Sequence, residues 1–317
     1  MNLNADLNSG APSGLVFPRP RDGGVELREE VLGLPDGYQT PVLHHVGAGG
    51  GGGPPVLYAH GIQSHPGWYV GSADALAAAG HDVFQVTRRG SGTNTAGRGD
   101  APSAGRLLDD VEAALEWLCA RTGADAAALL GVSWGGKLLT AFALDRPRRV
   151  ASLTLVAPGL CQRVDVSAGT KLAIAASLLC CPRRRFDIPL SDVRLFTDRP
   201  DMQDYLRNDP HRLQRATARL MLASRRLDRR LTRAPDGSLR VPTTLILAER
   251  DRIIDSKATA ALVRRLTAGR ARVRTFDAEH SIEFVPDPAG FFAALVGAAE
   301  ATGPAPGGPQ DEAGSCG

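Results

Sequence analysis

The residues of this chain best suited to chemistry are a serine, an acid and a histidine, in that order along the sequence. Ser133 lies in the pentapeptide GVSWG at residues 131–135, which has the spacing G-x-S-x-G. Asp251 follows an apolar run, and His280 is the only histidine after His211. A histidine oriented by a carboxylate can take the proton of a serine hydroxyl and so make the oxygen a nucleophile. The set predicts attack by Ser133 on a carbonyl carbon.

The elements around Ser133 are those that a nucleophile on a sharp turn requires. A short apolar run, residues 128–132, predicts a buried strand, and a helical pattern follows from Lys137 to Asp145. Gly131 and Gly135 leave room where the turn presses against strand and helix, and glycine tolerates unusual backbone angles. The free N–H groups at the start of the helix favour negative charge beside the serine.

Three carboxylates compete for the role of the acid. Residues 243–247 predict a strand, and Glu249 and Asp251 leave its end. Asp251 is the preferred acid because a carboxylate there can orient the histidine. Asp255 is the rival, although its sequence context is typical of an N-cap that begins a helix ending near Leu266. Glu249 is the third candidate.

Five segments together resemble the α/β-hydrolase superfamily, most closely its monoacylglycerol lipase, lysophospholipase and serine aminopeptidase branch. They are HGIQSH at 60–65, RGSG at 89–92, GVSWGG at 131–136, AERD at 248–251 and EHS at 279–281, and they span about 220 residues. Thr87 departs from the pattern, because the family often has an acidic residue two positions before Arg-Gly. The resemblance implies a mostly parallel sheet flanked by helices, with a helical lid inserted after the sixth strand.

The resemblance also implies an oxyanion hole, a pair of backbone N–H groups that stabilise the negative oxygen of a tetrahedral intermediate. The first donor follows the strand Pro54–Ala59, and we assign it to Ile62. The second is the residue after the nucleophile, Trp134. His60 is expected to shape the loop before Ile62, and its alternative role is that of a ligand or a base.

The resemblance and the local composition divide the chain into five parts. Gly, Pro, Asn and Ser are frequent in residues 1–24 and 301–317, which predicts disordered tails. Residues 25–158 and 241–300 are expected to form the two parts of the hydrolase core. Residues 159–240 are expected to form the lid.

The predicted lid differs from the core in charge and pattern. Residues 159–240 hold 17 Arg and Lys against nine Asp and Glu, a net charge of +8, whereas the rest of the chain carries −5. Residues 172–181 are an apolar run followed by PRRR, and residues 211–231 predict a long amphipathic helix. We expect an apolar acyl pocket under the lid. Its basic rim is a candidate for transient contact with an anionic membrane surface, the alternative being an ordinary solvated cap.

Composition predicts a protein with a sizeable buried core and disfavours several other classes. The formal net charge of +3 gives no indication of nucleic-acid binding. The five cysteines lack a CxxC pair, which disfavours a disulfide framework or a zinc site, and free thiols are typical of a reducing compartment. No apolar run reaches the roughly 18 residues of a membrane-spanning helix, and the N-terminus shows no signal peptide. A cytoplasmic location is expected.

The predicted reaction is transfer of an acyl group from a small-molecule or lipid ester to water. It proceeds through an acyl-enzyme on Ser133 and needs no metal or organic cofactor. An ester of a lipid-like acid is favoured by the apolar stretches of the lid and by the family. Hydrolysis of an amide or a thioester, and transfer to an alcohol, remain alternatives on the same residues. A further alternative is a binding protein on this fold without catalysis.

Overall fold

The computed structural model describes residues 15–19, 21, 24–50 and 52–301 of the 317-residue chain. The described strands form an eight-stranded sheet, with the order β1-β2-β4-β3-β5-β6-β9-β10, and a separate two-stranded sheet. The eight strands are β1 (Leu27–Gly33), β2 (Gln39–His45), β3 (Val56–Ala59), β4 (Val83–Val86), β5 (Ala127–Val132), β6 (Val150–Val156), β9 (Thr243–Ala248) and β10 (Arg272–Phe276). β1 and β2 are antiparallel to their neighbours, and the other pairings are parallel. The predicted, mostly parallel sheet is confirmed.

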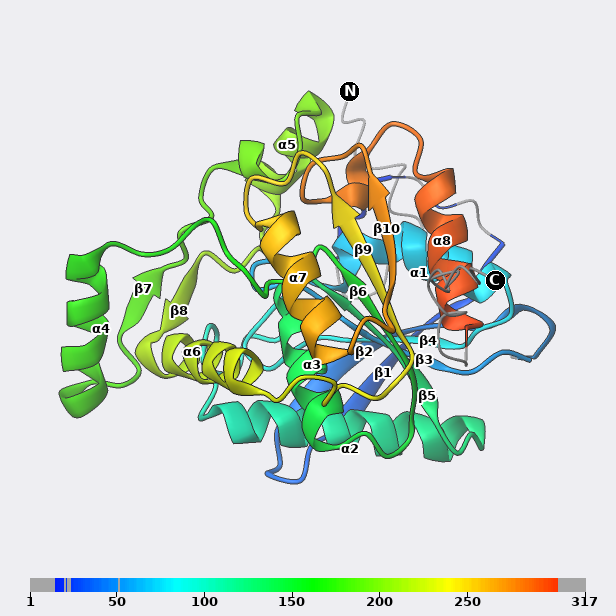
Figure 1. The fold of residues 1–317 in the computed structure, drawn as a ribbon, viewed down its shortest axis with the longest axis horizontal. Coiled ribbons are helices and arrows are strands. Elements are labelled where there is room, and N and C mark those ends of the chain that lie inside the picture. The colour runs from blue at the N-terminus through cyan, green and yellow to red at the C-terminus, as the bar shows by residue number, and fades with distance from the viewer. Residues whose placement is uncertain (1–14, 20, 22–23, 51, 302–317) are drawn as a thin grey trace, which may run out of the picture.

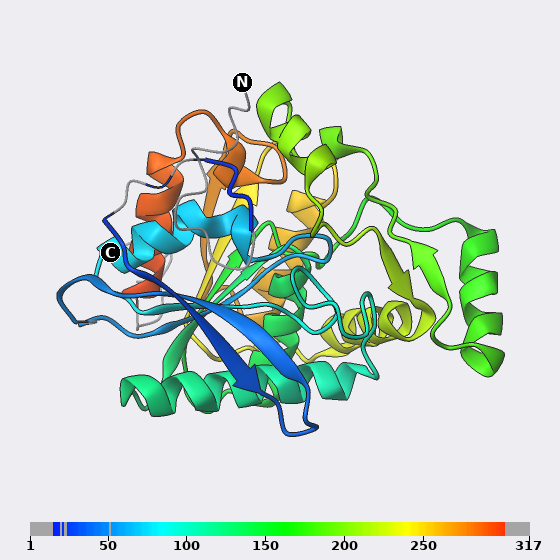
Figure 2. The same ribbon diagram turned by 180° about the vertical axis from the view of Figure 1, so that it is seen from behind.

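Helices cover both faces of this sheet (Figures 1 and 2). They are α1 (Val70–Ala78), α2 (Ala104–Thr122), α3 (Trp134–Asp145), α7 (Ser256–Leu266) and α8 (Ala289–Ala299). In Figure 1, α8 lies to the right of β9 and β10, and α7 lies to their left. The amphipathic pattern of α2 explains its place, because Leu107, Val111 and Leu118 are buried along one side of the helix.

β5 lies between β3 and β6, and all six of its residues are buried. A continuous apolar run of this kind is typical of a parallel strand that is covered on both faces. Since the parallel strands point the same way, the loops that follow β3, β5, β9 and β10 leave the sheet at one edge. These four loops carry Ile62, Ser133, Asp251 and His280.

The segment that joins β6 to β9, called the β6–β9 segment below, covers residues 157–242. Its elements are α4 (Ala168–Cys180), β7 (Arg185–Asp187), a 3₁₀ turn (Val193–Leu195), α5 (Pro200–Asn208), β8 (Arg215–Thr217) and α6 (Ala218–Arg233). In Figure 1, α4 and the β7–β8 pair lie at the left side of the molecule, away from the large sheet. None of the described helices has the length and apolar character needed to cross a bilayer.

The boundaries of α6 differ from the sequence-based expectation. Its helix begins at Ala218, and residues 211–217 are not helical. Arg215–Thr217 is extended because it pairs with β7, and the Thr217 side chain then caps α6 by accepting the N–H of Leu220. The amphipathic character is as expected, with Ala223, Leu227 and Leu231 among the buried residues. The prediction of a helix from residue 211 was therefore wrong in its first seven residues.

The predicted N-terminal tail is also wrong for part of its length. Leu15 and Phe17 are buried and pack with Leu43 and Val70. These apolar side chains are covered by β2 and α1, which explains why the chain is packed there despite its Gly- and Pro-rich surroundings. Residues 1–14 and 302–317, where the remainder of the predicted tails falls, lie outside the described residues.

Candidate active site

Ser133 occupies the sharp turn between β5 and α3. Its backbone φ is 52°, in the left-handed region that residues other than glycine rarely adopt. The turn presses against the end of β3, because a Cβ atom on Gly135 would lie 2.2 Å from the carbonyl oxygen of Ala59. Glycine is therefore required sterically at that position of the G-x-S-x-G pattern. The result is a serine at the N-terminus of α3, where unpaired N–H groups favour negative charge.

The structure brings the side chains of Ser133, His280 and Asp251 into one hydrogen-bonded line. His280 Nε2 lies 3.0 Å from Ser133 Oγ, and His280 Nδ1 lies 2.8 Å from Asp251 Oδ2. All three residues are buried. Because the carboxylate accepts the Nδ1–H, Nε2 is the nitrogen that can accept the serine proton. The arrangement can therefore activate Ser133 as a nucleophile.

The three candidate acids differ in their surroundings. Asp251 uses its second oxygen, Oδ1, to accept the backbone N–H groups of Ile253 and Ile254, each at 2.8 Å. These bonds fix the carboxylate while Oδ2 faces the histidine. Asp255 instead caps α7, where its side chain accepts the N–H of Ala258. Glu249 is exposed. The geometry thus favours Asp251 over both rivals.

Ile62 and Trp134 line one cavity together with Ser133. The loop before Ile62 passes directly beside the nucleophile, because a Cβ atom on Gly61 would lie 3.4 Å from the Cβ atom of Ser133. Trp134 is the first residue of α3, so its N–H has no carbonyl partner within the helix. Both residues therefore lie at the same cavity as the Ser133 hydroxyl.

His60 uses both ring nitrogens within the protein. Its Nε2 accepts the backbone N–H of Arg88 at 3.0 Å, and its Nδ1 then donates to the carbonyl of Gly61 at 2.8 Å. Burial, together with the charge of Arg88, holds the pKa of His60 well below its usual value. A neutral imidazole with both nitrogens occupied shapes the loop rather than acting as a base or a ligand.

A cavity of about 430 Å³ extends from Ser133 beneath the β6–β9 segment. Its walls come from the loops after β3, β5 and β9 on one side and from α4, α6 and the chain near β7 on the other. The apolar side chains among its lining residues include Ile62, Val164, Ile174, Leu178, Ile188, Leu190, Met221, Leu222, Ile253 and Ile254. Such a lining suits an apolar acyl chain.

Charged groups line another part of the cavity. Asp228 forms an ion pair with Lys137, whose Nζ lies 2.6 Å from the carboxylate and which is completely buried. Burial lowers the pKa of Lys137, and the charge of Asp228 opposes that change. Trp134 Nε1 donates to Ser224 Oγ at 3.0 Å, so the residue after the nucleophile is held by α6. The β6–β9 segment thus touches the turn that carries Ser133.

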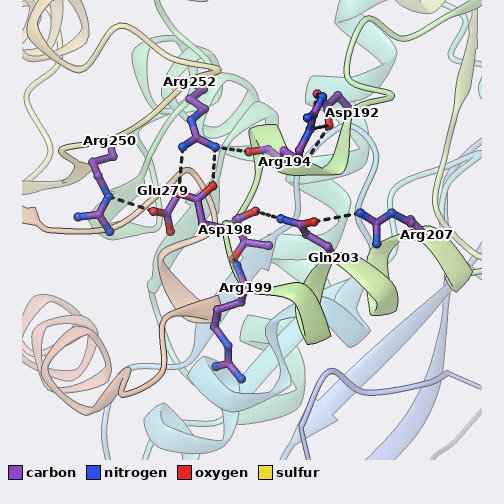
Figure 3. A network of polar contacts seen from close by, with 10 residues as sticks. Asp192, Arg194, Asp198, Arg199, Gln203, Arg207, Arg250, Arg252 and Glu279 are labelled. Carbon is purple, nitrogen blue, oxygen red and sulfur yellow. Dashed lines mark hydrogen bonds and ion pairs between the residues drawn. The ribbon is translucent and has the colours of Figure 1, made fainter.

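A polar network connects the loops of Asp251 and His280 to the β6–β9 segment (Figure 3). Arg250 donates to Glu279 at 3.0 Å, which joins a neighbour of Asp251 to a neighbour of His280. Arg252 donates to both oxygens of Asp198, at 2.7 and 2.9 Å, and to the carbonyl of Arg194. These partly exposed pairs contribute little to stability. Their effect is to fix the position of the two loops relative to the segment above them.

Two buried polar residues near the site have no recognisable sequence signal. Arg212 donates to Gln63 Oε1 at 3.0 Å and to the carbonyl of Leu190 at 2.6 Å, and so fixes the loop that carries Ile62. Glu283 accepts the N–H and the hydroxyl of Ser72, at 3.0 and 2.6 Å, and its burial raises its pKa to about 7. Gln63 lies 149 residues from Arg212 in sequence, and Ser72 lies 211 residues from Glu283, so no local pattern can indicate either contact.

Within the described part of the chain, no three His, Cys, Asp or Glu side chains are grouped as metal ligands would be.

Comparison with known proteins gives relatives of the same fold. The monoglyceride lipase of Saccharomyces cerevisiae, solved as a soluble variant with a substrate analogue, superposes with a TM-score of 0.74 at 19% identity and covers 89% of this chain and 96% of that one. The monoacylglycerol lipase of Paleococcus ferrophilus gives a TM-score of 0.70 at 20% identity, over 88% and 100% of the two chains. The fold is therefore the α/β-hydrolase fold.

A sequence relative matches over a shorter length. The inferred carbamate hydrolase RutD of Variovorax paradoxus (strain S110) is 32% identical over 114 residues, which is 36% of this chain and 41% of that protein. The family model of the serine aminopeptidases, S33, matches residues 54–284, well over half of the chain and the range that holds Ile62, Ser133, Asp251 and His280. This chain belongs to the serine aminopeptidase S33 family of α/β hydrolases.

Proposed function

We propose that this protein is a serine hydrolase that cleaves carboxylic esters of lipid-like acids. The observation that carries the proposal is the hydrogen-bonded line Ser133–His280–Asp251 at one end of a largely apolar cavity. The line supplies a nucleophile and its base, and the cavity supplies a place for an acyl chain. The family membership agrees with this reaction class.

In the proposed mechanism, Ser133 Oγ attacks the carbonyl carbon while its proton passes to His280 Nε2. The negative oxygen of the tetrahedral intermediate accepts hydrogen bonds from the N–H groups of Ile62 and Trp134. The intermediate then expels the alcohol, which takes the proton from His280, and leaves an acyl ester on Ser133. Water attacks this ester with His280 as its base and releases the acid. Asp251 stabilises the positive charge on His280 in both steps.

The substrate is proposed to be a small-molecule or lipid ester. The apolar lining beneath the β6–β9 segment supports this choice, as do two relatives of the same fold that are named as monoacylglycerol or monoglyceride lipases. Amide or thioester hydrolysis and transfer to an alcohol use the same residues and remain the alternatives. The relative named as a carbamate hydrolase keeps substrates with a C–N bond among them.

We further propose that residues 159–240 act as a lid over the site, between two parts of the core at 25–158 and 241–300. The cavity supports this division, because residues of the core and residues of the lid line it together.

On α4 of the lid, Leu172 and Leu179 are 73% and 91% exposed, and Arg183–Arg185 follow the helix. These exposed leucines, together with the arginines that follow them, suit transient contact with an anionic membrane surface. A cytoplasmic location is proposed from the thiol usage of the chain.

The proposal is tested by labelling with a fluorophosphonate, which reacts with an activated serine. We expect the wild type to be labelled, with mass added on the peptide that contains Ser133, and Ser133→Ala to remain unlabelled. Ser256→Ala, which changes a serine outside the site, is the matched control and should label like the wild type. An unlabelled wild type would favour a binding protein without catalysis.

The reaction class is then tested by product analysis with a monoacylglycerol and an added alcohol. Release of free fatty acid as the main product supports hydrolysis. A transesterified product formed in preference to the acid would make the protein an acyltransferase.

A further inference from the structure

Arg88 is a buried cation behind the two groups assigned as oxyanion donors. It follows β4, whose neighbours in the sheet are β2 and β3, and it is only 9% exposed. Its Nη2 donates to the carbonyl of Ile62 at 2.9 Å, and its guanidinium lies 4.8 Å from the ring centroid of Trp134. One side chain therefore contacts both residues to which the oxyanion donors are assigned.

The charge of Arg88 has no carboxylate partner among the described residues. Within the described residues, no acid lies within ion-pair distance of its guanidinium, and Nε and Nη1 are buried without a hydrogen-bond acceptor. Burial lowers the pKa of Arg88 to about 10, so it keeps its charge at neutral pH. A buried, unpaired charge destabilises a fold. Ion pairing therefore gives no reason for arginine at this position.

The neighbouring residue shows what a structural arginine looks like in the same turn. Arg89 is equally buried, at 6% exposed, but its guanidinium donates to both oxygens of Asp110, at 2.5 and 2.6 Å, and pairs with Asp36. It joins the loop after β4 to α2. The two adjacent arginines thus differ in their partners, because Arg89 pairs with two acids and Arg88 pairs with none of the described ones.

We propose that Arg88 is a positioning residue for the reaction. It holds Ile62 and Trp134 in fixed positions relative to each other and places a positive charge behind both. The hydrogen bond fixes the Ile62 peptide, and the cation–π contact holds the Trp134 indole. Ser224 of α6 holds the same indole through Nε1. A fixed positive charge favours the oxyanion, which exists in the transition state and not in the bound ester.

This proposal rests on the proposed function, so the test first establishes that the wild type turns over. The variant is Arg88→Met, with Arg89→Met as the matched control, and the readouts are kcat and KM on a p-nitrophenyl ester, the fluorophosphonate labelling rate, and Tm. For Arg88→Met we expect kcat and the labelling rate to fall about tenfold to hundredfold. KM should stay within about twofold, because Arg88 is not among the residues that line the cavity, and Tm should stay the same or rise.

The control is expected to behave in the opposite way. Arg89→Met should lower Tm, since it leaves Asp110 without its partner, while kcat at a temperature where the variant is folded stays within about twofold. Arg88→Gln removes the charge and keeps an N–H donor, and it serves as a second variant should Arg88→Met not fold. It is expected to lose kcat at unchanged KM as well.

Two results would overturn the proposal. One is wild-type kcat in the folded Arg88 variants. The other is a loss of Tm in them as large as that of Arg89→Met, which would make Arg88 a structural residue. A wild type that neither turns over nor labels would instead contradict the proposed function, and the role of Arg88 would fall with it.

Discussion

Among single residues, Ser133 has both a strained backbone and a hydroxyl that is hydrogen-bonded to His280. A non-glycine residue at a φ of 52° costs about 1–3 kcal/mol, which the surrounding turn must offset. The strain exposes the hydroxyl to His280, and Asp251 is held in turn by two backbone N–H groups. Each side chain of the line is therefore fixed by a neighbour, so small changes at any of the three should affect the rate.

The choice of acid can be tested by comparing two substitutions of the same kind. Asp251→Asn removes the charge that stabilises His280 and disturbs its orientation, so kcat should fall by about 10⁴. Asp255→Asn keeps an N-cap that is about as good and lies outside the hydrogen-bonded line, so kcat should change by less than about twofold. Steady-state kinetics on one ester measures both, and the reverse ranking would move the acid to Asp255.

Glu283 gives a prediction for pH. Its pKa is raised by burial to about 7 in the folded protein, from an ordinary value of 4.5. The folded state then binds more protons than the unfolded state between these pH values, so this group's contribution to stability is present below pH 4.5 and is lost as the pH rises through 7. The loss is about 3 kcal/mol.

Glu283→Gln removes this titration. The Tm of the variant minus the Tm of the wild type should therefore be larger at pH 8 than at pH 5. Thermal unfolding of both proteins at both pH values measures this difference. A difference in Tm between variant and wild type that is the same at pH 5 and pH 8 would contradict the assignment.

At the scale of elements, predictions from the sequence were best where the pattern is local. The buried run of β5, the turn at Ser133 and the cap at Asp255 each depend on a few adjacent residues. The start of α6 was missed because residues 215–217 are extended only through pairing with β7. Arg88 carried no signal either, since its role depends on two loops that the fold brings to it. What the sequence could not indicate is pairing between distant segments.

The exposed face of α4 leads to a prediction about membranes. Its two exposed leucines, Leu172 and Leu179, should bind at the surface of vesicles that contain phosphatidylserine. Replacing both with serine should lower the bound fraction severalfold in a sedimentation assay. Val31→Ser is the control, because Val31 is 63% exposed on β1 and lies outside α4. Equal binding of the double variant and the wild type would contradict membrane contact through this helix.

At the scale of the whole molecule, the site is assembled from both the core and the β6–β9 segment. The core supplies the hydrogen-bonded line Ser133–His280–Asp251, and the segment supplies most of the apolar wall of the cavity. The network around Arg252 and the bond from Trp134 to Ser224 keep the two parts together. Substitutions in the β6–β9 segment should therefore change which ester is preferred without changing the steps of the reaction.

Leu222 offers a test of this division. It lines the cavity from α6, and Leu222→Trp would fill part of the space for the acyl chain. The preferred ester should become shorter, while the fluorophosphonate labelling rate stays close to that of the wild type. Leu262→Trp, a change on a half-buried leucine of α7 that does not line the cavity, is the control. An unchanged preference in Leu222→Trp would mean that the acyl chain lies elsewhere.

Turnover of p-nitrophenyl esters from acetyl to palmitoyl, with the wild type beside Ser133→Ala, tests both the nucleophile and the acyl group. We expect activity that is greatest for medium or long chains, and a loss of at least about a thousandfold in Ser133→Ala with an unchanged Tm. Activity that survives in Ser133→Ala would show that another residue is the nucleophile. Turnover that is greatest for acetyl would contradict the lipid-like acyl group, and the cavity would then serve another part of the substrate.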